Sequence, residues 1–285
     1  MLGPLRFYLE NDFNTGSEEV GFNLLQAYGQ AGNTYGGYGF SAFVDADSLP
    51  DTLDDEGPSG AALLRVAAVR QIFKLAPGLT ATLSVEDPSS QIDILPEGST
   101  PEEPMPDIVG ALRFEQGWGH VQGAVVARDL GYSRPGVSRS HFGYGLHVSG
   151  LAKIEGDFLM AGFTYGDGIA RYFNDLGGLG YDAVIEPSGR VRPLEAYGGF
   201  VGYTLNWDAQ WSSNLVASIL MLERDPFLPR TAYRSGRYAA ANVIMQASPN
   251  FTAGFETPYG RHELQDGRDA DDVRLQVSLK YDLVQ

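Results

Sequence analysis

The last segment of the chain, residues 273–281, alternates apolar and polar side chains without interruption. Successive side chains of a β-strand point to opposite faces, so this segment has one apolar face and one polar face. Similar segments recur along nearly the whole chain, and this pattern is typical of a transmembrane β-barrel with its polar face inside. The apolar residues are Val273, Leu275, Val277, Leu279 and Tyr281, and the polar residues are Arg274, Gln276, Ser278 and Lys280.

The composition agrees with an all-β chain. Thirty-six glycines, fifteen tyrosines, fifteen phenylalanines and three tryptophans among 285 residues favour strands, tight turns and aromatic girdles over helices. No window holds eighteen consecutive apolar residues, which excludes a helical membrane span. The absence of cysteine excludes disulfides, thiol nucleophiles and thiolate metal sites.

Charge is distributed unevenly. The formal net charge of −16 disfavours a nucleic-acid partner, because phosphates are bound by Lys and Arg. Of the 36 acidic residues, 17 lie in three segments that we expect to be loops, 44–60, 87–107 and 262–272. Arginines are frequent in the predicted strands. The pattern therefore predicts acidic loops around a more basic wall.

Apolar runs and turn residues together predict one antiparallel barrel of about 14 strands, each about ten residues long. Short Gly-, Pro-, Asn- and Asp-rich linkers suit hairpins and alternate with long polar loops, including 131–140 and 168–194. Residues 169–176 are expected to form a short helix within the second of these. The predicted strands are 4–13, 20–31, 34–43, 61–74, 79–87, 107–116, 118–130, 141–155, 157–167, 195–207, 211–223, 236–247, 250–261 and 270–283.

Strand parity assigns side chains to the two faces of the barrel. Arg65 and Arg70 have opposite parity, so one of them is expected near a rim or after a bulge. Trp118, Trp207 and Trp211 lie beside short turns, where an aromatic girdle is expected. The residues predicted to face outward at the two ends of the chain are Leu5, Phe7, Leu9, Leu275, Val277 and Leu279.

A family resemblance rests on the stretch SAFVDADSLPDTLDDEGPSG, residues 41–60, between the strand YGGYGF and the arginine-bearing strand ALLRVAAVRQ. This arrangement resembles the DcaP-like trimeric outer-membrane porins. Further similar stretches cover nearly the whole chain; they are LRFYLENDF (5–13), LQAYGQAG (25–32), LSVEDPSSQI (83–92) and GRHELQDGRDAD (260–271).

The resemblance implies a sixteen-stranded barrel, a homotrimer in the bacterial outer membrane, and uptake of dicarboxylates and other small organic anions. It implies that this chain is an N-terminally truncated member, lacking the signal peptide, a helical segment and two strands, so that strand 4–13 would pair with strand 270–283 or leave an open edge. It makes 44–60 the third long loop, which folds inward in general porins. Family chains end on an aromatic residue, whereas this chain ends on Gln285.

Two sets of charged residues are the candidate site. A ladder of guanidinium groups would bind carboxylates and lower the barrier for anions, although these bases could equally pair with lumen acids and hold the barrel's shape. The candidate pore-lining bases are Arg6, Arg65, Arg70, Arg113, Arg128, Lys153, Arg274 and Lys280. The candidate constriction-loop acids are Asp45, Asp47, Asp51, Asp54, Asp55 and Glu56.

The acidic set has two further interpretations. Oxygen ligands suit a hard divalent cation, but the spacing lacks the glycine and terminal Glu of an EF-hand loop. A solvated or arginine-paired loop is favoured instead, and such acids facing a basic wall would set up a transverse field across the pore.

The sequence does not favour an enzyme. It contains neither a G-x-S-x-G elbow nor an H-E-x-x-H pair, and it calls for no cofactor or metal. Our leading hypothesis is therefore a passive outer-membrane porin for small carboxylates, with membrane lipid around it. The alternative is a soluble or surface all-β protein, either a carbohydrate-binding protein or a hydrolase.

Overall fold

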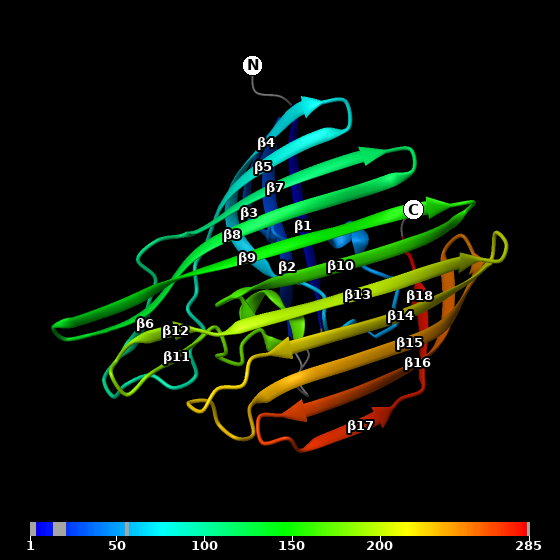
Figure 1. The fold of residues 1–285 in the computed structure, drawn as a ribbon. Coiled ribbons are helices and arrows are strands. Elements are labelled where there is room, and N and C mark those ends of the chain that lie inside the picture. Colours follow the sequence, from blue (N-terminus) through cyan, green and yellow to red (C-terminus); the bar gives the residue numbers. More distant parts are fainter. Residues whose placement is uncertain (1–3, 14–20, 55–56, 284–285) are drawn as a thin grey trace.

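The computed structural model describes residues 4–13, 21–54 and 57–283. An antiparallel sheet curls around the molecule, with tight turns along one rim and longer connections along the other (Figure 1). Fourteen strands follow one another in hydrogen-bonded order, and each pairs with its neighbour in the chain. They are β1 (Leu5–Asp12), β2 (Asn23–Ala31), β3 (Thr34–Phe40), β4 (Arg65–Ala76), β5 (Leu79–Glu86), β7 (Asp107–Gln116), β8 (Gly119–Arg134), β9 (Val137–Ile154), β10 (Asp157–Asp167), β13 (Glu195–Asn206), β14 (Trp211–Leu222), β15 (Tyr233–Ser248), β16 (Phe251–Leu264) and β17 (Asp269–Val273).

The last position in the strand order is shared by β17 and β18 (Gln276–Tyr281), which both pair with β16. Tyr259 opposes Val273 on β17 and Glu256 opposes Gln276 on β18, so the two pieces pair with β16 in one unbroken register. The predicted strands correspond one to one with the fourteen positions of this strand order, when β17 and β18 are counted together. Within the described residues no ladder joins β1 to β17 or β18.

Three short strands and three 3-10 helices lie in the connections. The short strands are β6 (Thr100–Glu102), which pairs with β8, and the hairpin β11 (Ala183–Ile185) and β12 (Val191–Pro193). The helices are η1 (Ala46–Ser48), η2 (Ala170–Tyr172) and η3 (Asn174–Leu176), of which the last two confirm the short helix expected at 169–176. No helix in the described part of the chain is long and apolar enough to cross a membrane.

One predicted loop is wrong. Residues 131–140 were expected to be a long polar loop, but β8 and β9 continue as a ladder up to the pair Arg134 and Val137. Gly136 at the turn has φ of +77°, a conformation that glycine adopts without strain. Polarity misled the prediction, because strands that extend beyond the apolar band no longer need an apolar face.

The two faces of the sheet separate as strand parity predicts. The six residues predicted to face outward, Leu5, Phe7, Leu9, Leu275, Val277 and Leu279, are 65–77 % exposed. On β8 the outward Val121 and Val125 are exposed, whereas the inward His120, Ala124 and Val126 are buried. Exposed apolar side chains on one continuous face are what a barrel presents to lipid.

The largest cluster of buried apolar side chains lies inside the barrel. Phe43, which follows β3, packs there with residues of the β10–β13 connection and with inward residues of the wall. Full burial of such a side chain stabilises the fold by roughly 1.5–3 kcal/mol. The cluster includes Phe43, Ile169, Tyr172, Phe173 and Leu176 from the connections, and Val109, Val126, Leu220 and Leu222 from the wall. Two connections therefore fill part of the interior.

Candidate functional site

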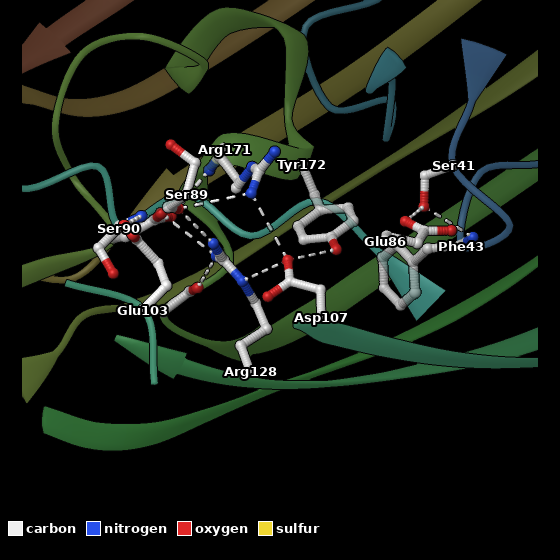
Figure 2. Close-up of polar contacts among 12 residues, drawn as sticks. Ser41, Phe43, Glu86, Ser89, Ser90, Glu103, Asp107, Arg128, Arg171 and Tyr172 are labelled. Atoms are coloured by element: carbon white, nitrogen blue, oxygen red, sulfur yellow. Dashed lines mark hydrogen bonds and ion pairs between the residues drawn. The ribbon is translucent and has the colours of Figure 1, made fainter. Parts of the chain in front are cut away.

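Residues 41–64, called here the inner segment, leave the end of β3 and turn into the barrel. Their first contact is Glu86, an inward residue of β5 that is 2 % exposed. Its carboxylate accepts a hydrogen bond from the Ser41 hydroxyl at 2.6 Å and one from the Ala42 backbone N–H at 2.8 Å (Figure 2). A buried carboxylate requires such donors, so this contact fixes where the segment enters.

Asp45 anchors the segment to three consecutive strands. Its Oδ1 atom lies 3.0 Å from Nη1 of Arg113 on β7. Its Oδ2 atom lies 2.9 Å from Nε2 of His120 on β8 and accepts a 2.7 Å hydrogen bond from the Ser149 hydroxyl on β9. Asp47 reaches the same arginine at 2.9 Å but stays exposed to solvent. One acid is therefore a buried anchor, and the other faces open space.

The far side of the barrel holds the segment through Glu256. This fully buried carboxylate on β16 accepts the backbone N–H groups of Leu53 and Asp54 at 2.9 Å each. Asn242 on β15 donates to the same carboxylate at 2.9 Å and to the Asp51 carbonyl at 2.8 Å. The inner segment thus crosses from β5 to β16 along the inside of the wall.

The segment then returns toward β4. Asp54 forms an ion pair of 2.6 Å with Arg274, which lies between β17 and β18. The hydroxyls of Ser59 and Ser218 lie 3.1 Å apart. A cavity of about 390 Å³ lies beside Arg274, within the size range of small-molecule sites. Its lining includes Ser59, Tyr233, Tyr238, Asp272 and Arg274.

A stack of tyrosines and arginines follows the inner face of β1 to β4, away from the contacts of the inner segment with the wall. Tyr8 stacks on Tyr28 with ring centroids 5.2 Å apart, and Tyr28 lies 4.6 Å from Tyr35. The guanidinium of Arg6 lies 5.5 Å from the Tyr8 ring, and that of Arg70 lies 4.3 Å from the Tyr35 ring. We call these five residues the tyrosine ladder. Arg6 lies at one end of this stack and Arg70 at the other.

The family of the chain follows from a match over its whole length. A model described as "Porin subfamily" matches residues 1–285. The chain belongs to this porin family. No curated protein matches it.

Solved outer-membrane channels share the fold of this porin. The DcaP channel of Acinetobacter baumannii aligns with a TM-score of 0.87 at 21 % identity, covering 97 % of this chain and 80 % of that one. An anion-selective porin from Comamonas acidovorans gives 0.62 at 11 % identity, covering 97 % and 84 %. A loop-deleted OmpT of Vibrio cholerae gives 0.59 at 9 % identity, with the same coverage. With the family match, this shared fold identifies the porin as a barrel channel of the bacterial outer membrane.

Arg128, predicted among the pore-lining bases, has no exposed surface and cannot meet a solute. Its Nε atom lies 3.0 Å from Asp107, and its Nη2 atom donates to the Ser89 carbonyl at 2.7 Å (Figure 2). Its Nη1 atom lies 3.2 Å from Asp182. Because Ser89 and Asp182 belong to different connections, the arginine ties both of them to β8. We therefore leave it out of the proposed pore lining.

Tyr172 of η2 completes this buried network. Its hydroxyl donates to Asp107 at 3.0 Å (Figure 2). Burial, and then the charge of Asp107, raises the pKa of Tyr172 well above its ordinary value, so the phenol remains a donor. The network holds the β10–β13 connection inside the barrel.

The other predicted bases are spread over the molecule. Arg65 opposes Phe40 at the first position of β4, on the outward parity, and its guanidinium lies 4.5 Å from that ring. Of Arg65 and Arg70, which have opposite parity, Arg65 is therefore the one that lies at the rim. Lys153 and Lys280 are exposed near the short turns, and Lys280 pairs with Asp282 at 3.3 Å. Only Arg113 and Arg274 contact the described acids of the inner segment.

The predicted acids are likewise divided. Asp45 and Asp54 are buried in ion pairs, while Asp47 and Asp51 are exposed. Asp55 and Glu56 lie outside the described residues. The sequence analysis did not predict Tyr28 and Tyr35 as site residues. Tyr28 has the same inward parity as Gln26 on β2, and Tyr35 the same as Gly37 on β3, and this parity was the signal that could have identified them.

Proposed function

We propose that this porin lets small organic anions, dicarboxylates among them, diffuse passively through the barrel along the tyrosine ladder. No chemical step is involved, and the working assembly is a trimer. The inner segment is the constriction. It occupies the β5 to β16 side of the interior and leaves the inner face of β1 to β4 as the other wall of the path.

Unpaired cations carry the proposal. Arg6 and Arg70 have no carboxylate at ion-pair distance among the described residues, whereas Arg113, Arg128 and Arg274 each have at least one. A guanidinium that is already paired offers an anion little, because its charge is balanced. Two unbalanced guanidinium groups lower the electrostatic barrier for a carboxylate.

The opposite side of the path is acidic. The carboxylates of Asp47 and Asp51 are exposed on the inner segment. Acids on one wall and arginines on the other produce a field across the path, which orients a solute that carries separated charges. We therefore expect a dicarboxylate to travel along the arginine wall.

The test compares charged and neutral solutes of equal size. Replacing both cations, R6Q with R70Q, should lower succinate permeation several-fold more than that of a neutral sugar in liposome-swelling assays. A wall charge alters the barrier for an ion but barely changes the steric barrier. At 1 M salt the difference should shrink, because charges are screened beyond about 3 Å.

The matched control is R224Q with R268Q. Both arginines lie in or beside the long loops and are paired with acids, Arg224 with Glu263 at 2.7 Å and Arg268 with Asp266 at 2.9 Å. This pair should leave the succinate-to-sugar ratio unchanged. Equal losses of sugar and succinate in the R6Q/R70Q protein would show that the two arginines only shape the path.

A further inference from the structure

A groove of about 510 Å³ runs along the outer face of β13 to β16. Its floor is made of the small side chains of Ala217, Ala239 and Ala241. Ala217 opposes Ala239, and Ala241 opposes the larger Leu215, which flanks the floor. Val201 and Tyr259 also line the groove. An apolar channel with a low floor and taller flanks on a lipid-facing wall has the shape of a hydrocarbon chain.

Two arginines stand directly beyond one end of this groove. Ala239 opposes Tyr259, and the next outward pair toward the long loops is Arg237 and Arg261. Directly opposed residues have Cβ atoms about 4.5–5.5 Å apart, so these like charges repel unless an anion lies between them. Among the described residues, Arg261 has one ion-pair partner, Asp269 at 2.8 Å, and it opposes Asp271 on β17. Arg237 is exposed and has no ion pair with a described acid.

The height of this pair places it at the membrane boundary. Met245, opposite Trp211 at the short-turn end, lies eight positions from Arg237 on the same strand. At about 3.3 Å per residue and a tilt of about 35–45°, that separation spans roughly 19–22 Å of the membrane. The apolar band is about 25 Å tall, and a long side chain reaches beyond its Cα atom toward the headgroups.

We propose that Arg237 and Arg261, together with the groove below them, bind a phosphorylated lipid of the outer leaflet. The two guanidinium groups would hold the headgroup phosphate, since their donors match phosphate geometry, and an acyl chain would lie over Ala217, Ala239 and Ala241. A ligand that occupies both the arginine pair and the apolar groove must carry a phosphate and a hydrocarbon chain in one molecule. A second copy of the chain packed on this face by two-fold symmetry would instead bring a like-charged pair to it.

The experiment measures lipid retention by the purified full chain in detergent. The probe is hexa-acylated lipid A carrying both phosphates, titrated by native mass spectrometry, with the enzymatically dephosphorylated lipid in parallel. R237Q with R261Q should weaken retention of the phosphorylated lipid at least ten-fold and leave retention of the dephosphorylated lipid unchanged. R224Q with R268Q, on the same rim, should stay within two-fold of the parent.

A second variant tests the groove. Leucine at two floor positions, A217L with A241L, should weaken retention of both lipids without changing the arginines. Millimolar inorganic phosphate should not release the bound lipid, because it lacks the chain. Heat-modifiable migration on gels verifies that each variant is folded. Retention within two-fold of the parent for R237Q/R261Q, an equal loss in R224Q/R268Q, or a change of oligomeric state in place of lipid loss would overturn the proposal.

Discussion

Asp45 and Arg113 form an ion pair in which the carboxylate is 1 % exposed and the guanidinium is 21 % exposed. The acid belongs to the inner segment and the base to β7, so this pair joins the segment to the wall at the edge of the open space. The same carboxylate also contacts His120 and Ser149. Its removal would take this acceptor from His120 and Ser149, whereas Arg113 would keep Asp47 and Glu115.

The first prediction concerns this anchor. D45N should lower the free energy of unfolding by about 1–3 kcal/mol, because buried donors lose a charged acceptor. Single-channel recordings should show larger and more frequent current fluctuations as the segment loosens. D47N removes the exposed partner of the same arginine and should change stability by less than about 1 kcal/mol. Equal effects of the two variants would contradict the assigned roles.

The second prediction concerns the two buried carboxylates that hold the ends of the segment. E86A with E256A removes the acceptors of Ala42, Leu53 and Asp54 N–H groups. Each site should cost about 1–3 kcal/mol. The open-channel conductance should rise, since the segment would no longer follow the wall. E97Q, at an exposed position of the β5–β7 connection, serves as the control, and an unchanged conductance in the double variant would argue against the segment as the constriction.

The third prediction concerns the buried arginine. R128M leaves the carboxylate of Asp182 without its cation and leaves Asp107 with only Arg171, at 3.6 Å. Breaking a buried pair in this way costs about 3–5 kcal/mol. The loss should appear in urea unfolding followed by tryptophan fluorescence. Anion selectivity of the protein that remains folded should be preserved. A specific loss of succinate flux at parental stability would instead return Arg128 to the pore lining.

The fourth prediction concerns pH and the turn after β16. The Arg268 backbone N–H, helped by the charges of Arg268 and Arg230, holds the pKa of Asp266 below its ordinary value. A lowered folded-state pKa gives stability that is present above the unfolded value, about 3.9, and is lost as the pH falls through the folded value. The protection factor of the Arg268 amide, which is corrected for the slower intrinsic exchange at low pH, should therefore fall between pH 5 and pH 3, by amounts that D266N abolishes. An identical fall in D266N would refute this cause.

Much of the fold could be read from the chain. Period-two alternation located the strands and their faces, including the opposite parity of Arg65 and Arg70. The role of Arg128 could not be read in this way. The β7–β8 hairpin register, in which Ile108 opposes Ala127, brings Asp107 to Arg128. Asp182 lies 54 positions after Arg128 in the β10–β13 connection, and only the folding of that connection into the barrel brings it to the arginine. The tyrosine ladder likewise depends on the register of β1 to β4, which alternation alone does not fix.

The hydrogen bonds of the inner segment have a consequence for how this pore can change. Its attachment to the wall uses backbone groups and a few buried acids, chiefly Asp45 and the donors that meet Glu86 and Glu256. The exposed side chains of Asp47 and Asp51 take almost no part in that attachment. We therefore expect substitutions at these two positions to change which solutes pass while the barrel around them folds as before. Selectivity and assembly would then depend on different residues of the same segment.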